Sequence, residues 1–302
     1  MYLDYVENIF DELDQAKSER DITQGFLDLL ANYRILSFKI ERGSMLWRAR
    51  KISSTRYNKI SELLYPPAEY VGYGRLNDIG EQVLYTSLRQ ETALSEISAK
   101  AGDLIQIAGF RIQPDRELKI STIGDFAHIQ KTGRSRLFGS DPELAITKML
   151  NDTPKEIAKA IIYTDKFLAY TLANVDASHE NYLRTRTLGK LIYQKAPANG
   201  IAFPSVKDKD GYNICFNKSS SDEHLQNVCS FVVRINKERR YGMMDFEIIE
   251  SAMDLQDDGT FIWDDGSTPT SFGIYNLTQS EYKTALSHKD DPNGLLTLIH
   301  GK

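Results

Sequence analysis

Apolar residues recur along the chain at two spacings, and each spacing predicts a different kind of element. In the first part they return every three or four residues, over Tyr2–Ala16 and again from Asp21 to Tyr33. This spacing lines them up along one side of a helix. We therefore expect two amphipathic helices that pack as a hairpin, with Asp21 as the N-cap of the second.

Short runs that favour β-structure follow, and they alternate with helical patterns. Extended structure is predicted for residues 35–52, 81–88, 103–112, 118–126, 200–206 and 211–216, and for much of the chain beyond 225. Helices are predicted for residues 89–102, closing on Gly102, and for most of 142–194. Because this alternation is irregular and the strands are short, an α+β fold is favoured over a doubly wound parallel sheet.

The same pattern divides the chain into three parts. Residues 1–44 form the N-terminal helical hairpin, and residues 45–216 form the main domain, which carries a helical insert at about 142–194. Residues 217–302 form a β-rich C-terminal extension that we expect to pack on the core. The polar run Asn217–His224 is the best candidate for the boundary between the last two parts.

Composition narrows the function classes. With 37 basic and 42 acidic residues the formal net charge is −5, which argues against a nucleic-acid or anionic-membrane partner. The two cysteines, Cys215 and Cys229, lie in no CxxC or Cys/His ligand spacing, so we expect neither a metal site nor a disulfide scaffold. No apolar run approaches the roughly 18 residues of a membrane span, and the acidic first residues do not form a secretory signal. A cytoplasmic protein is expected.

Three residues of one short stretch form a candidate site for a nucleotide. Arg75 follows Gly72 and Gly74 in a loop, Tyr85 lies in the next predicted strand, and Glu96 lies in the helix after it. A guanidinium can bind a diphosphate in a bidentate manner, and an aromatic ring can cover a flat base. A carboxylate can stabilise positive charge on a ribose whose base is leaving. Ordinary packing and surface roles for the same residues remain the alternative.

Several segments, in this order, resemble the RES domain family: "LWRAR" (46–50), "GRLNDIGEQVLYTSLRQETALSE" (74–96), "GIAFPS" (200–205) and "GYNICF" (211–216). Arg75 precedes Tyr85 by ten residues and Tyr85 precedes Glu96 by eleven, as in the family pattern. Leu76 departs from it, because a tryptophan often follows the core arginine. The positions that match the central pattern are Gly74, Arg75, Asn77, Gly80, Leu84, Tyr85, Glu91, Thr92, Ala93, Leu94 and Glu96.

The resemblance implies a fold and an activity. The fold would be an ADP-ribosyltransferase-like split β-sheet. The activity would be that of the toxin in a bacterial toxin–antitoxin pair, which cleaves the nicotinamide–ribose bond of NAD, its substrate, and needs no metal. The acceptor stays open between inorganic phosphate, water and a protein side chain. Further expected partners are a cognate antitoxin and a second copy of the chain. The rival hypothesis is a catalytically silent binding module.

The resemblance also implies roles for individual residues. Arg48 and Arg75 would bind the pyrophosphate or position a phosphate nucleophile, and Tyr85 would stack on nicotinamide. Glu96 would stabilise the transition state and orient the nucleophile. Ser205 would hydrogen-bond the nicotinamide ribose or Glu96, unless it only caps its own loop. Asn77 would bind ribose, unless it is a turn asparagine.

Overall fold

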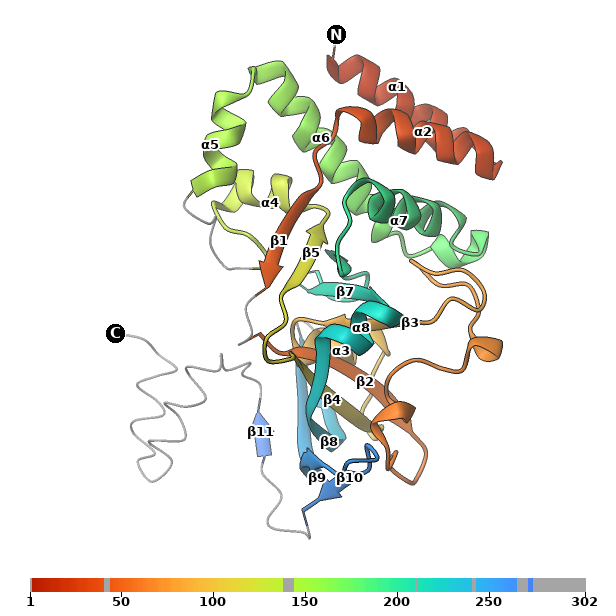
Figure 1. The fold of residues 1–302 in the computed structure, drawn as a ribbon, viewed down its shortest axis with the longest axis vertical. Helices are drawn as coiled ribbons and strands as arrows, with labels where there is room; N and C mark the ends of the chain where they lie inside the picture. Colours follow the sequence, from red (N-terminus) through yellow and green to blue (C-terminus); the bar gives the residue numbers. More distant parts are fainter. Residues whose placement is uncertain are drawn as a thin grey trace.

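A single twisted sheet runs through the molecule, with most of the helices gathered at one end of it (Figure 1). The computed structural model describes residues 2–40, 44–137, 144–209, 211–240, 243–264 and 271–273. Of the predicted C-terminal extension, residues 241–242, 265–270 and 274–302 lie outside these residues. The strands are β1 (Leu36–Ile40), β2 (Leu46–Ile52), β3 (Val83–Ser87), β4 (Leu104–Ile112), β5 (Leu118–Thr122), β6 (Gly200–Pro204), β7 (Tyr212–Asn217), β8 (Leu225–Glu238), β9 (Met244–Leu255), β10 (Phe261–Trp263) and β11 (Ser271–Gly273).

Helices and strands are mixed irregularly along the chain, and the predicted α+β class is confirmed. The α-helices are α1 (Tyr2–Gln15), α2 (Glu19–Asn32), α3 (Gln90–Glu96), α4 (Asp125–Thr132), α5 (Ala145–Asp152), α6 (Lys155–Leu172), α7 (Leu183–Lys195) and α8 (Lys218–His224). Short 3₁₀ helices include η1 (Ile60–Glu62), η2 (Ala68–Tyr70) and η4 (Ala177–Glu180). Among the described residues, no helix is long and apolar enough to cross a membrane.

The sheet is nearly split between β3 and β2. Its order is β1-β5-β6-β7-β3-β2-β4-β8-β9-β10, with β11 added to β9. Within the described chain, β2 and β3 share one residue pair, Trp47 with Ser87, whereas β3 and β7 share five. Every pairing is antiparallel except that of β5 with β6. Backbone groups at the β2/β3 junction are therefore available to side chains and ligands.

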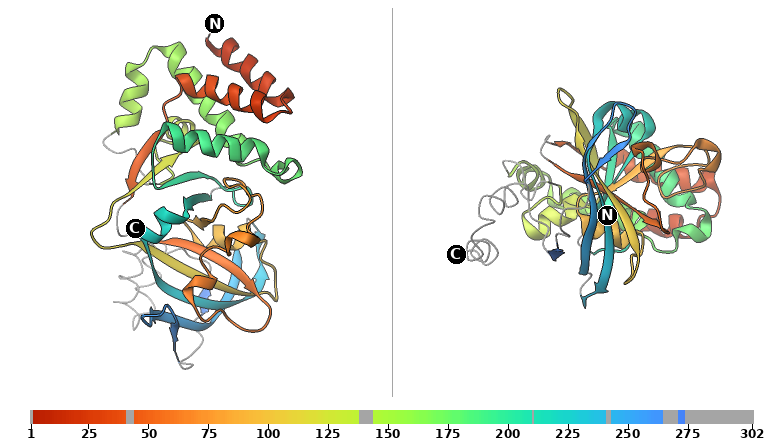
Figure 2. Two further views of the ribbon diagram at one scale, coloured as in Figure 1. Left: turned by 45° about the vertical axis from the view of Figure 1, so that its right-hand side comes forward. Right: turned by 90° about the horizontal axis from the view of Figure 1, so that it is seen from below.

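One half of the sheet carries most of the helices, whereas α3 and α8 lie by its middle strands. Figure 1 and the left view of Figure 2 show α1, α2, α6 and α7 together near the N-terminus, while β2, β4, β8 and β9 lie at the other end. Residues 225–255, assigned from the sequence to the C-terminal extension, form β8 and β9, and β8 pairs with β4 along its length. The extension thus begins within the same sheet.

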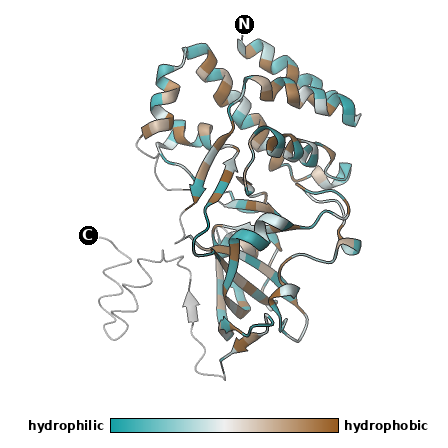
Figure 3. Cartoon of the chain, in the orientation of Figure 1, coloured by the Kyte–Doolittle hydropathy of each residue, from teal (hydrophilic) through white to brown (hydrophobic). Residues whose placement is uncertain are grey.

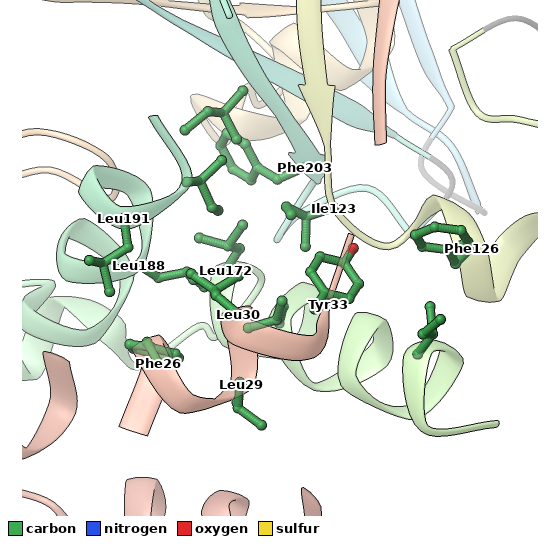
Figure 4. Packing of buried hydrophobic residues seen from close by; sticks show 14 of the residues in the cluster. Phe26, Leu29, Leu30, Tyr33, Ile123, Phe126, Leu172, Leu188, Leu191 and Phe203 are labelled. Carbon is green, nitrogen blue, oxygen red and sulfur yellow. The ribbon is translucent and has the colours of Figure 1, made fainter. Parts of the chain in front are cut away.

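The helical end has its own apolar core. Figure 4 shows residues from α2, α4, α6, α7 and β6 in contact, and Figure 3 shows polar and apolar residues along each helix, as expected of elements with one buried side. α1 buries Val6, Ile9, Phe10 and Leu13. The periodicity of the first helices therefore marks the sides that pack on each other and on α6 and α7.

Two predicted helix ends were wrong. Ser18, not Asp21, is the N-cap of α2, because its hydroxyl accepts the Asp21 N–H at 3.1 Å. α3 ends at Glu96, not near Gly102, because Ser98 takes a left-handed conformation (φ 49°) and the Ala99 N–H returns to the Leu94 carbonyl at 3.1 Å. The early end leaves Glu96 in the last turn of α3.

Candidate active site

Glu96 receives two hydrogen bonds on the same carboxylate oxygen. Ser205 Oγ donates to Oε1 at 2.5 Å, and Asn213 Nδ2 donates to it at 2.6 Å. Ser205 follows β6 and Asn213 lies on β7, and both are buried, whereas Glu96 is half-buried. Charge-assisted hydrogen bonds of this length orient a carboxylate strongly. The side chain of Glu96 is therefore fixed where β6 ends and β7 begins, and it is partly exposed to solvent.

Asn213 is itself held by a neighbouring strand. Ser87 lies opposite it across the β3/β7 pair, and the Ser87 hydroxyl donates to Asn213 Oδ1 at 2.6 Å. This contact turns the amide so that its NH₂ group faces Glu96. Neither residue was predicted from the sequence. The sequence offers one indication of Asn213: it is a polar residue within the otherwise apolar run 212–216 of β7, and a buried amide needs hydrogen-bond partners.

Ser205 combines two of the roles considered for it. Its hydroxyl accepts the backbone N–H groups of Lys207 (3.2 Å) and Asp208 (3.0 Å) while it donates to Glu96. Asp208 is in turn bound by Thr92 at 2.6 Å and by Arg89 at 2.9 Å. The loop after β6 is thus attached to the first turn of α3, the helix that carries Glu96.

Arg48 lies where β2 and β3 separate. Its Nη1 donates to the Tyr85 carbonyl at 3.1 Å, a contact that joins the two halves of the sheet. Its Nε is buried and has no hydrogen-bond partner among the described residues. Burial, and secondarily the nearby Arg50, lowers the pKa of Arg48 to about 9. An unsatisfied buried donor of a cation is costly, so this guanidinium is suited to an anionic ligand.

The guanidinium of Arg75 is held by the C-terminal end of α6. Its Nη1 donates to the carbonyl of Leu172 (2.7 Å), the last residue of α6, and to that of Asn174 (2.9 Å), two residues later. Burial lowers the pKa of Arg75, and the opposing influences come from Tyr182, Glu96 and Tyr85 in that order. The guanidinium therefore lies within electrostatic reach of Glu96 and Tyr85.

Tyr85 and Asn77 shape the loop that carries Arg75. The Tyr85 hydroxyl accepts the Leu76 N–H at 2.8 Å and donates to Asn77 Oδ1 at 3.2 Å. The Asn77 amide donates to the carbonyls of Gly72 (2.9 Å) and Asp78 (3.0 Å), which are the contacts of a turn asparagine. Burial raises the pKa of the Tyr85 hydroxyl well above its usual range. These bonds fix the ring of Tyr85 and the turn together.

Gly74 serves that turn. A Cβ there would lie 2.2 Å from Asn77 Oδ1, whereas a Cβ on Gly72 would meet no atom within 4 Å. The close approach that Gly74 permits is therefore to Asn77.

Five of the six predicted residues form two neighbouring groups. Glu96 and Ser205 are bonded directly, and Tyr85 contacts both Asn77 and Arg48. Tyr85 lies two positions before Ser87 on β3, so both side chains take the same face of the strand. Arg75 is the member held from outside these groups. Within the described chain, no cluster of three or more His, Cys, Asp or Glu residues could hold a metal ion, and Cys215 and Cys229 are buried free thiols.

Comparison with known proteins gives a family match and weak structural likenesses. The model of the RES domain family matches residues 45–243. No curated protein matches the chain. Among solved structures, a chain from the crystal structure of the M. tuberculosis MbcT–MbcA toxin–antitoxin complex is 10% identical, with a TM-score of 0.35 over 70% of this chain and 91% of that chain.

Proposed function

The chain belongs to the RES domain family, and from this premise we propose that it is an enzyme that cleaves the nicotinamide–ribose bond of NAD. The observation that carries the proposal is the carboxylate of Glu96, which two donors orient and which lies within electrostatic reach of Arg75. A fixed carboxylate within electrostatic reach of a held guanidinium suits a substrate that joins a cationic base to a diphosphate.

Glu96 would act on the ribose. When the C–N bond breaks, nicotinamide leaves with the bonding electron pair and positive charge develops at C1 of the ribose. A carboxylate near that carbon stabilises the charge more in the transition state than in the ground state, which is the condition for faster reaction. An acceptor oxygen then forms the new C–O bond, and a water acceptor also releases a proton. Ser205 and Asn213 would keep the carboxylate in place through both steps.

Arg48 and Arg75 would bind the phosphates. The buried Nε of Arg48 has no partner among the described residues, so a phosphate oxygen would satisfy it. Arg75 is held at Nη1, and a planar guanidinium still presents a second edge of donors. The ring of Tyr85, whose hydroxyl is fixed in the loop, would stack on nicotinamide. Asn77 would support that ring, with its predicted ribose contact as the alternative.

The biological role on this proposal is that of a toxin that depletes NAD and is inhibited by an antitoxin protein. Phosphate and water remain the two acceptors for NAD depletion, because both would use the same donor site. Transfer of ADP-ribose to a protein target is the alternative reaction. A catalytically silent binding module is the alternative to an enzyme.

The proposal is tested by incubating the purified protein with NAD in phosphate buffer and in phosphate-free buffer, with product masses measured. Hydrolysis gives nicotinamide and ADP-ribose, and phosphorolysis gives nicotinamide and a phosphorylated ADP-ribose. Glu96→Gln should release no nicotinamide above background. Glu69→Gln, an exposed change on η2, is the matched control and should behave as wild type. Absence of nicotinamide release by wild type in both buffers would refute the proposal.

The toxin role is tested in cells. Expression of wild type should arrest growth, and expression of Glu96→Gln to the same level should not. Equal arrest by both proteins would separate toxicity from NAD chemistry and favour the binding-module hypothesis.

A further inference from the structure

Arg75 closes the end of a helix far from it in the sequence. The last carbonyls of a helix have no intrahelical donors and carry the negative end of the helix dipole. The carbonyl of Leu172, the last residue of α6, and that of Asn174 both accept from Arg75 Nη1, at 2.7 and 2.9 Å. The guanidinium is therefore held from one side by the end of α6.

The ring of Tyr182 lies on a second side of the same guanidinium. Arg75 Cζ is 5.7 Å from the centre of the Tyr182 ring, within the range of a cation–π contact. Tyr182 is the N-cap of α7. The end of α6 and its connection to α7 therefore supply the two carbonyls and also the ring.

The backbone that presents this ring is strained. Asn181 and Tyr182 both take left-handed backbone conformations, with φ of 49° and 57°. Residues other than glycine rarely adopt this conformation. Hydrogen bonds fix the strained turn: the Tyr182 N–H donates to the Ala177 carbonyl at 2.8 Å, and the Tyr182 carbonyl accepts the Arg186 N–H at 2.9 Å. Strain that the surroundings maintain in this way is characteristic of functional sites.

We propose that Tyr182 is a positioning residue for Arg75, and that with the carbonyls of Leu172 and Asn174 it holds the guanidinium in the orientation that binds the substrate diphosphate. The effect of Tyr182 on substrate binding rests on the proposed NAD-cleaving function. The physical basis is preorganisation: a long arginine side chain that is already fixed loses little conformational freedom when the ligand binds. The contact itself is independent of any activity.

The catalytic consequence is tested with Tyr182→Leu, which keeps a large apolar side chain in the same backbone conformation but removes the ring. The Michaelis constant for NAD should rise about three- to tenfold, the range for losing a cation–π contact, while kcat stays within about twofold, because diphosphate binding is shared by ground and transition states. Tyr182→Phe should restore the wild-type constant. Asn181→Gly, which relieves the neighbouring strain and leaves the ring, is the matched control and should leave both constants unchanged.

The contact is tested separately by a double-mutant cycle in urea unfolding with Tyr182→Leu and Arg75→Gln. The stability loss of the double variant should be smaller than the sum of the two single losses, since each change removes the same contact. Additive losses would overturn the inference whatever the activity. A higher Michaelis constant in Tyr182→Phe, or an unchanged one in Tyr182→Leu, would overturn it as well. If wild type leaves NAD intact, the proposed function fails and the cycle alone decides whether Tyr182 holds Arg75.

Discussion

Glu96 and Asp165 are two carboxylates that several hydrogen bonds hold in place, but their surroundings differ. Asp165 lies within α6, fully buried, and accepts the Tyr33 hydroxyl (2.5 Å), the Gly124 N–H (2.8 Å) and the Ala127 N–H (2.9 Å). Figure 4 shows Tyr33 among the apolar side chains of this core. Glu96 is half-buried and receives side-chain donors only, both on Oε1.

The hydrogen-bond donors around Asp165 and Glu96 explain why one carboxylate has a structural role and the other is suited to a ligand. Gly124 precedes α4 and has no side chain to cap it, so Asp165 supplies the capping anion from another helix. The donors reach both carboxylate oxygens of Asp165, and the Tyr33 hydroxyl ties α6 to the end of α2. Asp165 therefore stabilises the packing of three helices. Glu96, whose two donors come from the strand end and loop around it, is arranged for contact with a ligand.

The largest expected effect is on stability, from Asp165→Ala. The change leaves a buried hydroxyl and two buried backbone N–H groups without their acceptor, which should cost about 3–5 kcal/mol of unfolding free energy. Urea unfolding followed by circular dichroism measures it. The Michaelis constant of the folded fraction should match that of wild type. A urea midpoint equal to that of wild type would show that Asp165 does not hold the helices together.

Glu96→Gln should lower activity and leave stability nearly unchanged, the reverse of Asp165→Ala. The amide keeps an acceptor at Oε1 for Ser205 and Asn213 but removes the charge, so NAD turnover should fall at least about a hundredfold, or roughly 3 kcal/mol in the activation barrier. The urea midpoint should change little. Turnover near the wild-type rate would mean that the carboxylate is structural, like that of Asp165.

The stability of the protein should depend on pH through Asp165. Burial is the main cause that raises the pKa of Asp165 to about 6, above its ordinary value of 3.8. A raised folded-state pKa means that the pH-dependent part of this group's contribution to stability is fully present below about pH 4 and is lost as the pH rises through about 6, whereas its hydrogen bonds remain in both forms. From pH 4 to 7 wild type should lose about 2 kcal/mol more unfolding free energy than Asp165→Asn, which does not titrate. Parallel pH profiles of the two proteins would contradict this.

The sequence predicted those parts of the site that lie close together along the chain. Arg75, Tyr85 and Glu96 lie within one loop–strand–helix unit, so their spacing and the RES resemblance were enough to select them as candidates. The helical stripes of α1 and α2 were equally local, because one periodic side is enough to identify a helix that packs on a core.

The parts that were missed depend on contacts between distant segments. Asn213 meets Glu96 across 117 residues, and Asn174 meets Arg75 across 99. Both contacts depend on the strand order β6-β7-β3 or on the path of α6, which local patterns do not specify. Asp165 was hidden for a related reason: in an amphipathic helix a single aspartate is expected at the surface, unless its partner, here the N-terminus of α4, is known.

The smallest expected effect tests how much the donors of Glu96 contribute. Ser205→Ala removes one of two hydrogen bonds to Oε1 and leaves Asn213 in place, so kcat should fall about five- to tenfold, near 1 kcal/mol, the usual net value of one hydrogen bond. Because the Ser205 hydroxyl also accepts the N–H groups of Lys207 and Asp208, a looser loop could produce the same loss. Thr92→Val separates the two causes, since it loosens the loop through Asp208 and leaves both donors to Glu96. If Thr92→Val lowers kcat as much as Ser205→Ala, the loop accounts for the effect; a clear difference between them assigns it to the hydrogen bond on Glu96.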